Sequence, residues 1–329
     1  MAAIAPVSAP SANPLSGHLA VNVEALRRLE RAVVDLLVQE DPDSPPALYQ
    51  RAGGELDHEL IDRLVETGIR KIYVRNEDFH RFGANLLERV ESLASHDVIP
   101  PAERFAALQM AAAMEIERTA HMIDCGPYVA VSQRVGQDLS HVFADNDVLP
   151  NDLFRLARHD FNTFTHVTNV AGYGVILAER LGLCSGSELE LVAKGAMLHD
   201  LGKRFIPVSV LNKPAKLDRE ERAIIETHPL RGYEELCLRD DVTFEQLMMA
   251  YQHHERFDGK GYPVGIAADE IHPWARMLAV VDVFDAMTGM RPYRKPATAQ
   301  EAMDYIRQNA GTHFDPEVVE CWDNAMSGA

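Results

Sequence analysis

The sequence has no long apolar run, no closely spaced cysteine pair and no cluster of basic residues. A membrane-spanning helix needs about 18 or more apolar residues in succession, so we expect none. Four scattered cysteines without a CxxC spacing predict free thiols in a reducing cytosol. Residues 1–17 lack the basic start and apolar core of a signal peptide. We therefore expect a disordered tail at 1–17 and a cytoplasmic location.

Basic residues are also outnumbered, with 32 Lys and Arg against 50 Asp and Glu and a net charge of −18. Binding to nucleic-acid polymers or anionic membranes depends on clustered cations, so neither is an expected partner. A small phosphorylated substrate is compatible with this charge only where metal ions or a few local cations reverse the field.

The N-terminal part of the chain, residues 18–77, predicts a small mixed α/β module. Apolar, β-prone segments predict strands over 32–39, 47–52 and 70–75, and helical spacing with a terminal glycine predicts a helix over 58–68. No catalytic residue types gather here. We expect a regulatory module that modulates activity or dimerisation.

The remainder predicts helices throughout. Residues 78–149 carry apolar positions three and four apart, interrupted by Pro100-Pro101, and predict a helical connector. Residues 150–329 show no alternation of strands and helices. Capping-box spacing at Asp218 with Glu221 and at Thr298 with Glu301 marks two helix starts. The chain is therefore expected to be mainly α, with an all-α C-terminal domain.

Candidate metal ligands follow one another through this domain. They are His166, His199, Asp200, His228, His253, His254 and Asp282. Several end apolar helical stretches, where an ionisable group facing a bundle interior is costly unless it is paired or binds a metal. A single histidine on a helix is more often an ordinary core or surface residue. Another adjacent pair, His159-Asp160, lacks the Leu-Gly-Lys that follows His199-Asp200, and is not expected to bind metal.

Two of these segments, HDLGK (199–203) and HHERFDGKGYP (253–263), strongly resemble the signatures of the HD-GYP family. THVTNVA, THPLRGYE and VVDVFDAMTGMRPYRKP, around positions 166, 228 and 282, also resemble that family. The resemblance covers about residues 160–322, with the motifs in the expected order.

The resemblance implies a bacterial, metal-dependent phosphodiesterase that hydrolyses cyclic di-GMP to pGpG or onward to GMP, with related cyclic dinucleotides as alternative substrates. It implies that the seven residues above bind two, sometimes three, metal ions, with Asp200 as the bridge between them. Iron or manganese is expected ahead of zinc, nickel or magnesium. The residue types agree independently, because imidazole and carboxylate together suit iron, manganese or zinc. Two such ions can activate a water for attack on phosphorus.

Cations near these motifs are candidates for phosphate contacts. Lys203, one turn beyond Asp200, could stabilise charge on a phosphate oxygen, or could be a solvated lysine. Arg291 and Arg294 resemble positions that hold the substrate's phosphates and guanines, with Tyr293 as a candidate for stacking; surface salt bridges are the alternative.

The GYP segment supplies two further substrate-binding candidates, Gly261 and Tyr262, although a purely structural turn is the alternative. Asp285, one turn beyond Asp282, is expected to support a ligand rather than to bind metal itself. Some HD-GYP proteins have a glutamate one turn before the first histidine, which helps to bind a third metal. Asn162 is found there in this chain, which favours two metals and pGpG as the main product.

Two other functions stay open. A general HD-domain phosphohydrolase acting on nucleotides is disfavoured by the GYP and RPYR segments. The other alternative is a receptor for cyclic di-GMP with slow or no turnover. The resemblance also implies GGDEF-type or other signalling proteins as partners, and a homodimer is compatible with the helical connector.

Overall fold

The structure is a computed structural model. It describes residues 18–39, 41, 44–69, 71–75, 77–78, 81–86, 88, 104–105, 108–109, 112, 115–116, 119, 122–144, 150–157, 163–211, 213, 215–289 and 295–328. The predicted disordered tail lies outside these residues. The chain divides into two compact units, an N-terminal unit (Met1–Arg89) and a C-terminal unit (Val90–Ala329).

The N-terminal unit contains a four-stranded antiparallel sheet with the order β1-β4-β2-β3. Its elements are β1 (His18–Asn22), the 3-10 helix η1 (Val23–Arg28), β2 (Leu36–Val38), β3 (Ala47–Gln50), α1 (His58–Glu66) and β4 (Lys71–Arg75). The α1 helix begins at Asp57, whose side chain accepts a hydrogen bond from the Glu59 amide, and Gly68 follows its end with φ of 84°. The predicted helix and strands of this module are confirmed, with shorter bounds.

Two details of this sheet differ from the sequence expectation. The strand predicted over 32–39 is limited to β2, because Ala32 pairs with the turn at Gly53 and Gly54 instead of continuing the ladder. Asp35 also turns out of the ladder, and its side chain accepts a hydrogen bond of 2.9 Å from the Ala52 amide. The β1 strand was not predicted.

The C-terminal unit is helical, as expected. Its helices are α4 (Gly126–Ala144), α5 (Pro150–Ala157), α6 (Thr163–Arg180), α7 (Glu188–Leu198), η2 (Leu201–Phe205), α8 (Val208–Leu211), α9 (Arg219–Ile225), α10 (His228–Leu236), α11 (Phe244–Gln252), η3 (Ala268–Glu270), α12 (Pro273–Thr288), α13 (Ala299–Gln308) and α14 (Pro316–Ser327). The described residues between 104 and 119 are also helical. Among the described residues of this unit, β-pairing is limited to one isolated bridge, Ala310 with Phe314.

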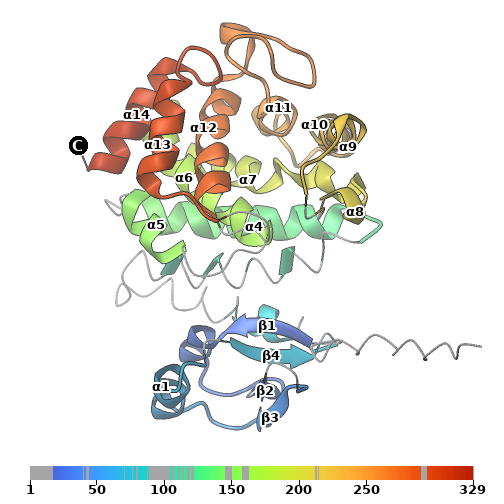
Figure 1. Cartoon of the computed structure of the whole chain (residues 1–329), viewed down its shortest axis with the longest axis vertical. Helices are drawn as coiled ribbons and strands as arrows, with labels where there is room; N and C mark the ends of the chain where they lie inside the picture. Colours follow the sequence, from blue (N-terminus) through green and yellow to red (C-terminus); the bar gives the residue numbers. More distant parts are fainter. Residues whose placement is uncertain are drawn as a thin grey trace, which may run out of the picture. The chain divides into compact units, whose positions relative to one another are not determined.

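The helices pack around α6 and α7. Figure 1 shows α13 and α14 at one side of the C-terminal unit and α8, α9 and α10 at the other. The α7 helix contacts α4, α6 and α11, and α12 contacts α6 and α11. Both predicted capping boxes are present, Asp218 with Glu221 at α9 and Thr298 with Glu301 at α13. The capping boxes help to fix where α9 and α13 begin.

An aromatic cluster joins three of these helices on the side of α14. Tyr173, Phe284 and Trp322 are buried, with ring centroids 5.3 to 5.7 Å apart and edge-to-face angles. This geometry is favourable between aromatic rings and locks α6, α12 and α14 together. All four cysteines are free, as predicted. No helix among the described residues is long and apolar enough to cross a membrane.

Candidate metal centre

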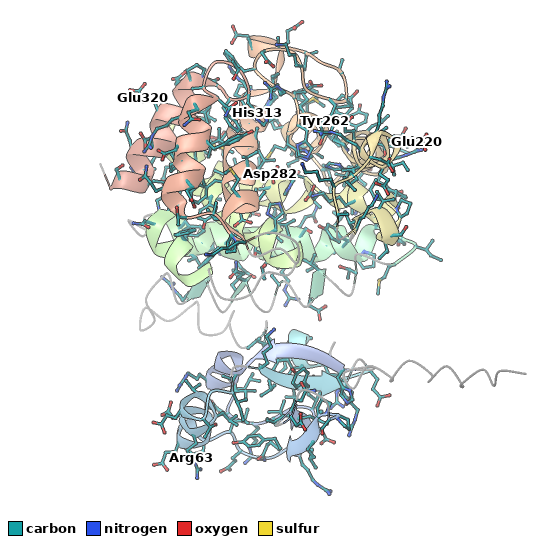
Figure 2. The ribbon with its side chains drawn as sticks, viewed as in Figure 1. Arg63, Glu220, Tyr262, Asp282, His313 and Glu320 are labelled. Carbon is teal, nitrogen blue, oxygen red and sulfur yellow. The ribbon has the colours of Figure 1, made fainter. Side chains whose placement is uncertain are left out.

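The seven predicted ligand residues converge in the interior of the C-terminal unit, although they are far apart in sequence. They come from α6 (His166), the junction of α7 and η2 (His199, Asp200), the start of α10 (His228), the end of α11 (His253, His254) and α12 (Asp282). All except the partly exposed His254 are buried. Figure 2 shows Asp282 among the helices, whereas Glu220 and Glu320 lie at the periphery.

Their potential ligand atoms form two groups, each with atoms within 4.8 Å of one another. The first group contains His166, His199 and Asp200, and the second contains His228, His253 and His254. Asp282 belongs beside the first group, because its Oδ1 lies 3.0 Å from His166 Nε2 and 4.0 Å from His199 Nε2.

Asp200 lies between the two groups. Its Oδ2 is 3.7 Å from His166 Nε2 and 3.4 Å from His199 Nε2. Its Oδ1 is 3.4 Å from His228 Nε2 and 3.8 Å from His253 Nε2. Burial alone would raise the pKa of this carboxyl, but nearby positive charge, above all that of Lys203, holds it well below its usual value. Asp200 therefore presents one anionic oxygen to each group.

The imidazole rings are oriented by main-chain carbonyls of the turns that precede them. The Nδ1-to-oxygen distances are 2.6 Å for His199 to Ala196, 2.8 Å for His228 to Ile225 and 3.0 Å for His253 to Ala250. A carbonyl can only accept, so each Nδ1 carries a proton and each ring directs its Nε2 to the centre. Histidines that bind metals typically have such a partner on the other nitrogen.

The resulting arrangement leaves polar atoms without partners. His228 Nε2 and His253 Nε2 face each other at 3.2 Å, each with a lone pair in these tautomers. Among the described residues, His199 Nε2 and Asp200 Oδ1 are buried without a hydrogen-bond partner. A buried polar atom without a partner costs about 1–3 kcal/mol. Cations at the two groups would satisfy these atoms, so the donor set fits a metal, and the cluster can bind one.

Burial favours, at two histidines of the second group, the neutral form that a metal requires. It lowers the pKa of His253 well below the usual value, and that of His254 to about 3. His166 behaves differently. Although burial would lower its pKa, hydrogen bonds to Asp282 and Asp285 raise it to about 9. At this position a proton and a cation compete for the same Nε2.

Asp285 holds the His166 ring on the side away from the metal centre. Its Oδ2 accepts a hydrogen bond of 2.7 Å from His166 Nδ1, and its Oδ1 accepts one of 2.8 Å from Asn169 Nδ2. Both oxygens are thus used away from the centre. The sequence placed Asp285 one turn beyond Asp282, and that spacing puts it against His166 rather than among the ligand atoms.

Gly202 of the HDLGK segment allows η2 to meet α10. A Cβ at this position would lie 1.9 Å from the His228 carbonyl oxygen and 2.6 Å from the Gly232 nitrogen, both main-chain atoms. No real side chain tolerates such distances. The absence of a side chain at position 202 therefore brings Asp200 within reach of His228.

A second glycine serves the loop at residues 257–265, called the GYP loop here. A Cβ on Gly261 would lie 2.4 Å from the Arg256 nitrogen, so the loop packs directly on the main chain after His254. The buried Glu255 side chain accepts hydrogen bonds from the amides of Val264 (2.7 Å) and Gly265 (3.0 Å). The Tyr262 ring then lies 4.8 Å from the His254 ring, tilted by 30°. Figure 2 shows Tyr262 near the centre of the unit.

The other predicted substrate-binding residues fall into two classes. Lys203 is at the centre, with Nζ 2.5 Å from Asp200 Oδ2 and its side chain partly exposed. Arg291, Tyr293 and Arg294 lie outside the described residues. The same holds for Asn162 and for the His159-Asp160 pair.

Sequence reasoning did not single out Glu255, Asn169 or Gln109. Asn169 is one helical turn beyond His166, and this spacing could have indicated that the two side chains share a face. Gln109 is more than fifty residues earlier and carried no local signal. Its Nε2 donates to Asn169 Oδ1 in the structure.

Comparison with known proteins agrees with this site. Residues 155–318 match the family model for an HD domain. Over 297 residues, 84% of this chain and 70% of the relative, the chain is 33% identical to cyclic di-GMP phosphodiesterase PA4108 of Pseudomonas aeruginosa. Over 174 residues it is 40% identical to the cyclic di-GMP phosphodiesterase response regulator RpfG of Xanthomonas campestris, and spans only 46% of that protein. Over 171 residues it is 39% identical to 3'3'-cGAMP-specific phosphodiesterase 2 of Vibrio cholerae, covering 32% of it.

A solved structure supports the fold. Bd1817, a HDG"Y"P protein from Bdellovibrio bacteriovorus, matches with a TM-score of 0.68 and 17% identity, over 94% of this chain and 100% of that one. The convergence of the seven residues agrees with the long match to the Pseudomonas protein and with the HD domain match. This chain belongs to the HD-GYP family of HD-domain proteins.

Proposed function

We propose that this chain is a metal-dependent phosphodiesterase that hydrolyses cyclic di-GMP to pGpG. The observation that carries this proposal is the pair of ligand groups on either side of Asp200, where, among the described residues, His199 Nε2 and Asp200 Oδ1 are buried without a hydrogen-bond partner. Two ions held there, iron or manganese by donor type, would supply an activated water and neutralise phosphate charge. Such a pair of ions suits in-line displacement at phosphorus.

Cyclic di-GMP is favoured over other cyclic dinucleotides by the extent of the match. The similarity to the Pseudomonas cyclic di-GMP phosphodiesterase extends over 84% of this chain, whereas that to the Vibrio cGAMP-specific enzyme covers 50%. Homodimerisation and binding of signalling proteins stay predictions.

The chain's own residues have distinct parts in this reaction. Asp200 stays anionic and bridges the two groups, while His199, His228 and His253 direct their Nε2 atoms inward. Lys203, at the partly exposed edge of the centre, can exchange its contact with Asp200 for a phosphate oxygen and stabilise the charge that develops there. We assign the remaining phosphate and base contacts to Arg291, Tyr293, Arg294 and the GYP loop at Gly261 and Tyr262.

Hydrolysis by the full chain, purified without oxygen and loaded with Fe²⁺ or Mn²⁺, tests this function. Cyclic di-GMP and 3'3'-cGAMP are offered separately, and pGpG and GMP are quantified. We expect metal-dependent pGpG from cyclic di-GMP, and none from the double variant His199→Ala/Asp200→Ala. The matched control is His159→Ala/Asp160→Ala, which changes the same residue types outside the signature and should keep turnover.

The possible outcomes separate the alternatives. Tight binding of cyclic di-GMP without product from the metal-loaded chain would identify a receptor instead of an enzyme. Efficient release of GMP would contradict the two-metal assignment based on Asn162. Turnover of other nucleotides alone would indicate a general phosphohydrolase.

A further inference from the structure

A chain of buried side chains leads away from the candidate metal centre to the segment before α4. Gln109 Nε2 donates a hydrogen bond to Asn169 Oδ1, and Asn169 Nδ2 donates to Asp285 Oδ1 at 2.8 Å. Asp285 Oδ2 accepts from His166 Nδ1 at 2.7 Å. All four side chains are buried, with 3 to 8% of their surface exposed.

The order of donors and acceptors in this chain is supported from both of its ends. An amide side chain has one oxygen that accepts and one nitrogen that donates, so Asn169 can face Asp285 in two ways. The Asp285 carboxylate favours the orientation in which Nδ2 points to it, and donation from Gln109 to Asn169 Oδ1 reinforces this orientation. In the reverse orientation, the amide oxygen would face a carboxylate oxygen, which is repulsive. The Gln109 amide is oriented in turn by the Thr165 carbonyl, 3.5 Å from its Nε2.

We propose that Gln109 and Asn169 are positioning residues for His166 at the metal centre. They hold the Asp285 carboxylate in place, and Asp285 in turn fixes the tautomer and direction of the His166 ring. This inference rests on the proposed metal site and adds two residues that touch neither metal nor substrate. Partners of this kind typically change metal affinity about 10- to 100-fold.

The geometry restricts the effect to one group of ligands. His228 and His253 are oriented by main-chain carbonyls a few residues before them, and no hydrogen bond among the described residues connects either ring to Gln109. Loss of the Gln109 hydrogen bond should therefore weaken metal binding at the first group and leave the second group unchanged. A general loss of packing would weaken both.

Titration of the full chain with Mn²⁺, followed by electron paramagnetic resonance, resolves the two binding events. Gln109→Met removes the donor at nearly constant shape. We expect one Mn²⁺ to bind about 10- to 100-fold more weakly and the other to bind as in the wild type. The matched control is Gln133→Met. Gln133 is likewise a glutamine whose side chain donates a hydrogen bond, to the Asp241 carbonyl at 2.8 Å, but it lies away from the centre. Its two affinities should match the wild type.

A second set of variants keeps the test decisive if Gln109→Met does not fold. Gln109→Glu preserves shape but accepts instead of donating, and should give the same selective loss. Asn169→Leu combined with either Gln109 variant should lower Mn²⁺ affinity no more than Asn169→Leu alone, because Asn169→Leu already breaks the chain of hydrogen bonds between Gln109 and Asp285. Unchanged affinities in the Gln109 variants, or equal losses at both sites, would overturn the positioning role. A wild type that binds no Mn²⁺ would instead overturn the proposed function.

Discussion

At the scale of single residues, the space at position 202 decides whether the metal centre can assemble. The His228 carbonyl and the Gly232 nitrogen occupy the volume where a Cβ would be. Both are main-chain atoms at the start of α10, so they cannot move aside as a flexible side chain would. Any side chain here must push η2, and Asp200 with it, away from His228.

We therefore predict that Gly202→Ala lowers metal content and turnover by at least tenfold, because a misplaced group in a site costs about that much or more. Metal analysis of the purified protein and hydrolysis of cyclic di-GMP measure this. Gly174→Ala is the matched control: it is also a buried glycine, but its added Cβ would meet only side-chain atoms 3.8 to 4.0 Å away. It should keep both properties. Equal behaviour of the two variants would contradict the explanation.

The sequence predicted that seven residues would gather at one centre, because each lies in a motif that can be read locally, among them HDLGK and HHERFDGKGYP; that these residues bind metal stays a prediction. The sequence was insufficient for what orients them. The carbonyls of Ala196 and Ala250 belong to no motif, and Gln109 reaches Asn169 only after two distant helices pack together. Such contacts depend on tertiary structure, which local spacing does not encode.

At the scale of elements, the GYP loop is held from two directions. The Glu255 side chain accepts hydrogen bonds from main-chain amides at the far end of the loop. The segment after α13 forms main-chain hydrogen bonds with the near end of the loop. The Phe257 amide donates to the His313 carbonyl at 3.1 Å, and the Asp258 amide donates to that of Thr312 at 2.8 Å. The His313 ring stacks on Phe314 with centroids 4.1 Å apart.

This second anchor should be sensitive to acid. Burial first, and then the charge of Arg256, lower the pKa of His313 to about 4. His313 takes up a proton near pH 6.5 in the unfolded chain but only near pH 4 in the folded chain. The contribution of the neutral His313 ring to the free energy of unfolding is therefore complete above pH 6.5 and is lost between pH 6.5 and 4. We predict that His313→Gln loses less stability than the wild type over that interval, by about 1 kcal/mol after allowance for partial exposure.

Urea unfolding at pH 7.5, 6, 5 and 4.5 measures the difference between the two proteins. A constant difference in stability between the two proteins does not bear on the prediction, so the slope with pH is the relevant quantity. Parallel curves for the two proteins would show that His313 does not contribute to acid sensitivity.

Elements were predictable where local signals are strong. Capping boxes and apolar spacing predicted α9, α13 and α1, and the Gly68 turn ends α1 as expected. The β1 strand was missed because it is defined by pairing with β4, a strand that follows only after all the others. The extent of β2 was overestimated because Ala32 and Asp35 bond to the turn before α1.

At the scale of the whole molecule, the candidate ligands tie together helices that are distant in sequence. His166 and Asp282 come from α6 and α12, and the other ligands come from three further segments. A bound cation therefore acts as a cross-link that only the folded C-terminal unit can form. The N-terminal unit contributes no residue to either ligand group.

We predict that removal of metal by a chelator lowers the Tm of the C-terminal unit and leaves unfolding of the N-terminal unit unchanged. At a free metal concentration of 100 times Kd, binding stabilises the folded state by about 2.7 kcal/mol. Scanning calorimetry with and without Mn²⁺ measures the shift. His199→Ala/Asp200→Ala provides the control, since its Tm should not respond to metal. A shift of equal size in that variant would point to binding elsewhere.

The positions of His199 and His253 at the ends of α7 and α11 have a kinetic consequence. Ends of helices open and close on their own more readily than helix centres. Here, opening of the last turn breaks the carbonyl contact that orients an inward-facing ring. Release of the ion and exchange of the amide hydrogens in those turns would then proceed through the same fraying event, so the two rates would rise and fall together.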